Sequence, residues 1–77
     1  MTIKLEDLNN IFLELFNRSD MSIKRETTAK DIEGWDSLMH VRIIISIEQN
    51  YNISFSASEA TSFDNVGDIL DLINSKI

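Results

Sequence analysis

The residues best suited to chemistry lie around one serine, in the stretch Gly34-Trp35-Asp36-Ser37-Leu38. No second histidine or basic side chain lies in this segment to activate Ser37 as a nucleophile, so hydrolytic chemistry is not expected. Either Asp36 or Ser37 could cap the helix that follows. The start of a helix also presents free N–H groups and a partial positive charge, which favour a phosphate on the serine oxygen. Ser37 is therefore a candidate attachment point for an anionic group, and Gly34 supplies the backbone freedom to hold it outward.

The acidic residues before this serine do not form a convincing metal site. Counting from Asp31 places Asp36 and Arg42 at the sixth and twelfth positions, where an EF-hand loop needs glycine and a bidentate glutamate. The chain has one histidine, His40, and no cysteine, so histidine clusters and thiolate sites cannot form. We expect no metal site and no catalytic residue. We expect His40 to be solvated in the first turn of a helix, with a partner contact as the alternative.

Composition and charge restrict the class of protein further. The 77 residues include 43% hydrophobic and 26% charged residues, which is the composition of a small globular domain rather than a disordered chain. A net charge of −6 repels nucleic acid, so a nucleic-acid partner is not expected. No apolar run approaches the ~20 residues of a membrane span. With no export signal at its amino terminus, the protein is expected to be cytoplasmic.

Helical periodicity recurs along the chain, while proline is absent and glycine occurs only twice. A three-to-four spacing predicts a first helix over about residues 3–17, from Leu5, Leu8, Phe12, Leu15 and Phe16. Residues 18–36 are polar and aperiodic, which predicts a long connection; such loops are often functional. Its few apolar residues could pin it to a core: Met21, Ile23, Ile32 and Trp35.

The most apolar segment predicts a second helix from Ser37 or Leu38 to about Asn50. At roughly 100° per residue, its core side is predicted to hold Val41, Ile44, Ile47 and Tyr51, with Ile43 at the margin. The opposite side is predicted to hold Leu38, Arg42, Ile45 and Gln49, with Met39 and Ser46 beside them. Large apolar side chains on this second side are unusual for a solvent face and suggest a contact surface.

Two shorter patterns complete an all-α prediction. Ser56-Ala57-Ser58-Glu59 has the form of a capping box, which predicts a short third helix ending near Ser62. Asp64 or Asn65 could cap a fourth helix, although Gly67 weakens its first turn. The apolar residues of that helix are Val66, Ile69, Leu70, Ile73 and Ile77.

Taken with this helix order, the motif at Ser37 resembles the acyl carrier protein family and its peptidyl and aminoacyl carrier relatives. The matching residues are Asp36-Ser37-Leu38 with Gly34 before them, and the helix ending at residues 47–51 resembles the family's "LEEEF"-type segment. The resemblance covers nearly the whole chain. It implies a single carrier domain over residues 1–77, folded as a small four-helix bundle of acyl-carrier type. It also implies a protein that is not an enzyme and is expected to be monomeric.

The resemblance further implies a covalent cofactor. A separate phosphopantetheinyl transferase would move 4′-phosphopantetheine from coenzyme A onto the hydroxyl of Ser37, and the arm's thiol would carry acyl or aminoacyl groups as thioesters. By analogy, Asp36 would assist recognition by the transferase and Leu38 would fill an apolar pocket on partners. An arm that supplies its own thiol is consistent with a chain that has no cysteine.

The partners implied are that transferase and the acyl- or aminoacyl-activating and transferring enzymes. The candidate contact residues are Trp35, Leu38, Met39, Arg42 and Ile45, and Trp35 is expected mainly to pack on the core. Residues 38–50 contain one acid, Glu48, unlike the acidic second helix typical of fatty-acid carriers. Weaker docking to basic patches favours a dedicated pathway over bulk fatty acid biosynthesis.

The sequence also leaves open an alternative that involves no arm. In it the chain is an unmodified acidic helical adaptor, and Ser37 serves only as a helix cap. The two hypotheses differ in whether the Ser37 hydroxyl is needed for function. The sequence does not identify the cargo under the first.

Overall fold

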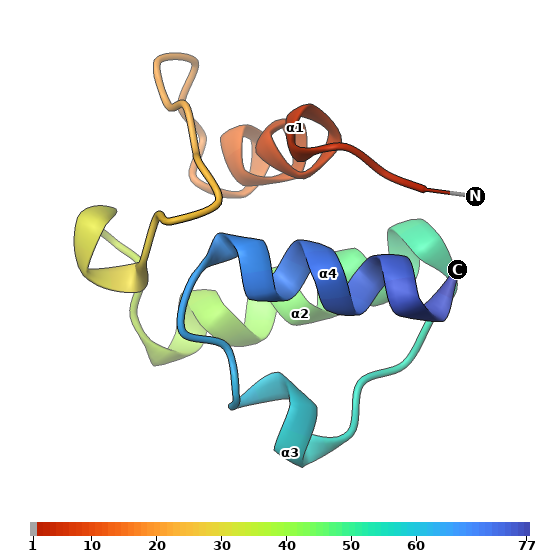
Figure 1. Cartoon of the computed structure of the whole chain (residues 1–77). Helices are drawn as coiled ribbons and strands as arrows, with labels where there is room; N and C mark the ends of the chain where they lie inside the picture. The colour runs from red at the N-terminus through yellow and green to blue at the C-terminus, as the bar shows by residue number, and fades with distance from the viewer. Residues whose placement is uncertain (1) are drawn as a thin grey trace.

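The computed structural model describes residues 2–77 and contains four α-helices and one 3₁₀ turn. The helices are α1 (Leu5–Leu15), α2 (Ser37–Tyr51), α3 (Ala57–Ala60) and α4 (Val66–Lys76), and the 3₁₀ turn η1 covers Ala29–Asp31. Figure 1 shows the long excursion of the chain between α1 and η1, and the short α3 standing apart from the longer helices. The predicted all-helical class, helix order and short third helix are confirmed.

One apolar core joins α1, α2, α4 and the connecting loops, and α1 packs directly against α2. Its most deeply buried side chains are Phe12, Leu8, Ile43, Ile47, Ile69, Ile73 and Val66. The Cα radius of gyration is 11.4 Å, which matches the ~11 Å expected of a compact chain of this length. The core side of α2 therefore has neighbours on several elements, which fixes the orientation of that helix.

The long loop is tied to the core by hydrogen bonds as well as by apolar contacts. Asn9 Oδ1 accepts from Ile23 N at 2.8 Å, and the Ile23 side chain is buried. The first N–H groups of α4 donate into the same loop: Val66 N to the Thr27 carbonyl and Gly67 N to the Arg25 carbonyl, both at 2.8 Å. These bonds satisfy donors that a helix start otherwise leaves unpaired. The loop is thus an ordered support for η1 and the start of α2.

Gly67 lies where the long loop closely approaches the first turn of α4. A Cβ at this position would lie 3.1 Å from the Arg25 carbonyl oxygen, so a larger residue would push the loop away from α4.

The two ends of the described chain are joined by a hydrogen bond, because Ile3 N donates to Asn74 Oδ1 at 2.8 Å. Ile3 is buried and precedes the extended N-cap residue Lys4, and the first helix begins two residues later than the sequence predicts.

Candidate functional site

The start of α2 is capped by Asp36. Its backbone is extended, its side-chain Oδ1 accepts from Met39 N at 2.8 Å, and its carbonyl accepts the first helical bond from His40 N at 2.9 Å. Gly34 precedes it with φ at +93°, a conformation that glycine adopts without steric cost. The turn at Gly34 thus brings Asp36, and not Ser37, into the capping position.

Ser37 is consequently the first residue inside the helix, and it is exposed. Its hydroxyl has no hydrogen-bond partner within residues 2–77, because the neighbouring aspartate already serves as the cap. The backbone N–H groups of Ser37 and Leu38 precede the first helical bond and lie at the positive end of the helix. A phosphoester on Ser37 Oγ fits this position chemically. The hypothesis that Ser37 serves only as a helix cap is wrong.

Trp35 and His40 form a connected pair beside the serine. The Trp35 ring packs edge-on against Phe12, with centroids 5.3 Å apart, which confirms the prediction that it packs on the core. Trp35 Nε1 donates to His40 Nδ1 at 3.2 Å, and His40 Nε2 lies 2.7 Å from the Ala60 carbonyl oxygen. The prediction of a solvated His40 was wrong, because both ring nitrogens have partners and the residue is half-buried.

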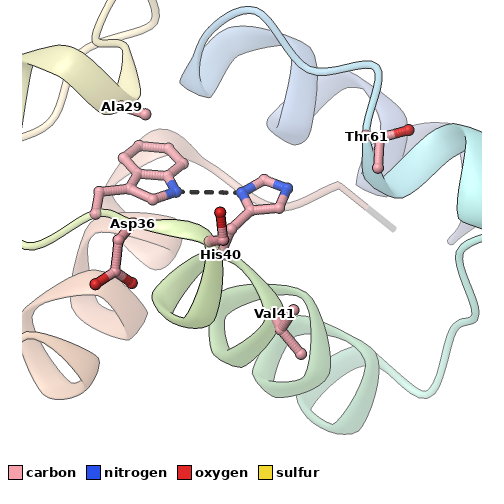
Figure 2. Close-up of a pocket in the computed structure, with 7 residues that line it drawn as sticks. Ala29, Asp36, His40, Val41 and Thr61 are labelled. Atoms are coloured by element: carbon pink, nitrogen blue, oxygen red, sulfur yellow. Dashed lines mark hydrogen bonds between the residues drawn. The ribbon is translucent and has the colours of Figure 1, made fainter.

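An open groove of about 570 Å³ lies next to Ser37. Figure 2 shows its walls coming from three elements: Ala29 on η1, Val41 on α2, and Thr61 directly after α3. The lining is mostly apolar, and the remaining lining residues are Trp35, Asp36, Ser37 and His40. Such a groove suits an uncharged chain whose attachment point is at its edge.

Three interactions stabilise the four-residue helix α3: one capping box within it and two contacts with other elements. Ser56 accepts from Glu59 N at 3.1 Å and donates its own N–H to Glu59 Oε1 at 2.9 Å, which confirms the predicted capping box. The pKa of Glu59 is lowered, mainly by the hydrogen bond from the Ser56 N–H and next by Lys76. The Nζ of Lys76 lies 3.1 Å from the Glu59 carboxylate. The third interaction is the contact of Ala60 with His40.

The outward side of α2 carries an apolar stripe, defined here as Leu38, Val41 and Ile45. Their exposed fractions are 64%, 52% and 46%. Assigning Val41 to the core was wrong: the buried side is centred on Ile43, which is fully buried, and on Ile47. The sequence analysis did not place Val41 on the outward side, although its spacing from Leu38 and Ile45 puts all three on one face.

The remaining predicted contact residues divide between the two sides of α2. Arg42 is exposed beside the apolar stripe, whereas Met39 is half-buried and packs against the core. Glu48, the sole acid among residues 38–50, is used structurally, since its Oε2 accepts from Phe55 N at 2.9 Å. The outward side of α2 is thus apolar and weakly basic rather than acidic.

Other charged groups form ion pairs away from this site. Arg25 and Asp71 join the long loop to α4 through two contacts of 3.1 and 2.7 Å, which raise the pKa of Arg25 and lower that of Asp71. Asp31 Oδ2 accepts from the backbone N–H of Thr28, the N-cap residue of η1, and so forms part of its capping box. Among residues 2–77 no group of three acidic, histidine or cysteine side chains could hold a metal ion. No helix in that range is long and apolar enough to cross a membrane.

Three comparisons with known proteins agree on one kind of protein. Residues 6–73 match the family model described as phosphopantetheine attachment site. An acyl carrier protein of Wolinella succinogenes is 27% identical over 70 residues, which cover 91% of this chain and 92% of that protein. The solution NMR structure of a holo acyl carrier protein from Geobacter metallireducens superposes with a TM-score of 0.88 at 42% identity. That match covers 94% of this chain and 83% of the other, so the predicted acyl-carrier type of fold is confirmed.

Proposed function

The chain belongs to the phosphopantetheine attachment-site family as an acyl carrier protein, a carrier without catalysis of its own, and we propose that Ser37 bears its arm. The observation that carries this proposal is the free, exposed Ser37 hydroxyl at the first position of α2. Asp36 takes the capping role that would otherwise occupy that hydroxyl. The positive end of α2 stabilises the phosphate once it is attached.

In the loading reaction Ser37 Oγ attacks the phosphorus of coenzyme A that bears the pantetheine group. The new O–P bond forms as the pyrophosphate bond breaks, the nucleotide leaves, and the hydroxyl proton passes to a base of the transferase. Magnesium serves the transferase. The chain contributes a reachable oxygen, the orientation of the helix start, and the carboxylate of Asp36 as a recognition group.

When attached, the arm supplies a thiol that holds acyl or aminoacyl groups as thioesters. The protein raises the concentration of that cargo at each enzyme it docks to, because a tethered group searches a small volume. The partners we propose are a phosphopantetheinyl transferase and the enzymes that activate and transfer the acyl group. The common apolar core of the described residues supports a single carrier domain, which we propose acts as a monomer.

The apolar stripe of α2 is proposed to contact these partners, together with Arg42 and the partly exposed Trp35. Met39, half-buried and packed against the core, would contribute a smaller part of the contact. Because this side of α2 lacks free acids, a partner with an apolar docking pocket fits better than one with a basic patch. This favours service to a dedicated biosynthetic pathway.

Incubation of the protein with coenzyme A, magnesium and a promiscuous transferase tests the attachment site. The intact mass should rise by one 4′-phosphopantetheine group in the natural chain and stay unchanged in Ser37→Ala. No mass gain in the natural chain, or a gain that survives Ser37→Ala, would reject Ser37 as the attachment residue.

The docking surface is tested with Ile45→Glu. This substitution should leave helicity unchanged, because Ile45 is 46% exposed, and should weaken binding to the transferase about tenfold or more by placing a charge in an apolar contact. Gln49→Glu adds the same charge farther along the exposed side and is the matched control. Equal effects from both variants would point to charge alone and contradict a contact at the apolar stripe.

A further inference from the structure

The first turn of α2 fixes the direction of the Ser37 hydroxyl, because that hydroxyl makes no hydrogen bond of its own within residues 2–77. One restraint on this turn is the cap. Asp36 Oδ1 accepts from Met39 N at 2.8 Å, and the Asp36 carbonyl accepts from His40 N at 2.9 Å. Helix ends fray, so any second restraint on the same turn bears directly on where Ser37 Oγ points.

A side-chain hydrogen bond supplies that second restraint. Trp35 Nε1 donates to His40 Nδ1 at 3.2 Å, and this bond is called the indole clamp below. Trp35 lies two residues before Ser37 and His40 lies three residues after it, so the clamp spans residues 36–39. Figure 2 shows the bond above the first turn of α2. The attachment serine therefore lies inside a segment that is held at both ends.

The indole clamp is itself anchored on both sides. The Trp35 ring packs edge-on against Phe12 of α1 with centroids 5.3 Å apart, and Trp35 N donates to the carbonyl of the buried Ile32 at 3.3 Å. On the other side, His40 Nε2 lies 2.7 Å from the Ala60 carbonyl oxygen at the end of α3. The clamp thus refers the start of α2 to the core of the domain.

The two nitrogens of the His40 ring have separate roles. An indole nitrogen can only donate, so His40 Nδ1 accepts from Trp35 and must be unprotonated. The ring hydrogen then resides on Nε2, which donates to the Ala60 carbonyl oxygen. Nδ1 therefore completes the indole clamp around Ser37, whereas Nε2 holds α3.

We infer that His40 is a positioning residue for the loading of Ser37. Through Trp35, its Nδ1 holds the backbone around the serine so that Oγ is presented to the transferase in one direction. The inference rests on the proposed attachment at Ser37. A reacting atom displaced by about 1 Å can slow a reaction on the order of 100-fold, so loss of the clamp should lower the maximal rate of loading more than the affinity for the transferase.

Two amide substitutions separate the roles of the two ring nitrogens. In His40→Asn the side-chain oxygen can take the place of Nδ1 and accept from the indole, but the side chain is too short to reach Ala60. In His40→Gln the amide reaches about as far as Nε2 and can donate to Ala60, while the Nδ1 acceptor is lost. Both variants lose the aromatic ring, so each is the matched control for the other.

Loading is measured in single turnovers with coenzyme A, magnesium and an excess of a promiscuous transferase, followed by intact mass. His40→Gln and Trp35→Phe should load at least about fivefold more slowly at saturation, with the half-saturating transferase concentration changed by less than about twofold. His40→Asn should keep most of the natural rate. Ser56→Ala, destabilised away from this turn, should load at the natural rate and so excludes general loss of stability as the cause.

Several outcomes of the loading experiment would overturn the inference. Equal rates in His40→Asn and His40→Gln would remove any special role for Nδ1. A slower rate in His40→Asn would mean that His40 acts through α3. A change confined to the half-saturating concentration would make Trp35 a docking contact only. Failure of the proposed attachment looks different, because the natural chain would then gain no mass.

The indole clamp can also be tested without any arm. In the unmodified protein, ¹⁵N NMR should find His40 protonated at Nε2. The Trp35 indole hydrogen should exchange with solvent at least about fivefold faster in His40→Gln than in the natural chain, and His40→Asn should resemble the natural chain. A His40 tautomer protonated at Nδ1, or equal exchange in all three proteins, would overturn the inference however Ser37 is loaded.

Discussion

Two helices of this protein begin next to a serine, and the two serines are used in opposite ways. At α3 the Ser56 hydroxyl accepts from Glu59 N and is committed to the capping box. At α2 the aspartate before Ser37 accepts the equivalent bond, and the Ser37 hydroxyl is left free. Because Asp36 caps α2, the hydroxyl of Ser37 is left free for modification, whereas the hydroxyl of Ser56 is occupied as the cap of α3.

Paired alanine substitutions test this contrast and have the largest expected effect. Ser37→Ala should abolish loading with phosphopantetheine while changing the free energy of unfolding by less than about 0.5 kcal/mol, since no bond is lost. Ser56→Ala should load normally and lose about 1 kcal/mol of stability, because it removes a cap. Intact mass and urea unfolding measure the two properties. Equal stability losses in both variants would contradict the difference between the serines.

A second pair tests whether the helix that carries Ser37 is held from its buried side. Ile43→Ala removes a fully buried side chain from the centre of α2 and should cost about 2–5 kcal/mol of unfolding free energy, a large part of the stability of so small a domain. Val41→Ala, on the apolar stripe, should change it by less than about 0.5 kcal/mol. Denaturant unfolding followed by circular dichroism distinguishes them. A larger loss from Val41→Ala would mean that the two sides of α2 are assigned the wrong way round.

Substitutions at Asp36 separate capping from recognition. Asp36→Ala removes the cap and should cost about 0.5–2 kcal/mol of stability. Asp36→Asn keeps an effective cap and should cost far less, yet it removes the negative charge proposed to assist the transferase. We expect kcat/KM of the transferase to fall in Asp36→Asn. Unchanged kcat/KM there would restrict Asp36 to a structural role.

The smallest expected effect is on the pH dependence of stability, and it arises at Glu59 of α3. The Ser56 N–H and Lys76 lower the pKa of Glu59 below its ordinary value of 4.5, so its contribution to stability is present above that pH and is lost as pH falls through the lower folded value. Thermal unfolding between about pH 6 and pH 3 should therefore depend less on pH in Glu59→Gln than in the natural chain. Parallel pH profiles for the two proteins would contradict this.

Much of the fold was predictable because local residue types specify it. Ser56 and Asn65 each cap a helix as their residue types suggest, and Asn65 Oδ1 accepts from Asp68 N at 2.9 Å. The apolar spacing in the first and last helices also identified most of their buried residues, although it missed the buried Ile11. In α2 the spacing was less informative, because large aliphatic residues occur on both sides of the helix: Ile43 and Ile47 are buried, whereas Val41 and Ile45 are exposed.

The rest of the site depends on contacts that sequence spacing cannot reveal. His40 is held by Ala60, twenty residues later, and by Trp35, so its burial follows from how the loops meet. Asp36 and Ser37 are both good capping residues, and the turn at Gly34 decides between them. Which side of α2 is buried follows from its packing on α1 and on the shared core. The cytoplasmic location stays a prediction.

The most direct test of the central claim is to locate the arm on the protein isolated from its own cells. Proteolysis followed by fragment mass spectrometry should find one 4′-phosphopantetheine group, on the peptide that contains Ser37, with the peptide containing Ser56 unmodified. An arm on another residue, or only bare Ser37 peptides throughout, would contradict the account.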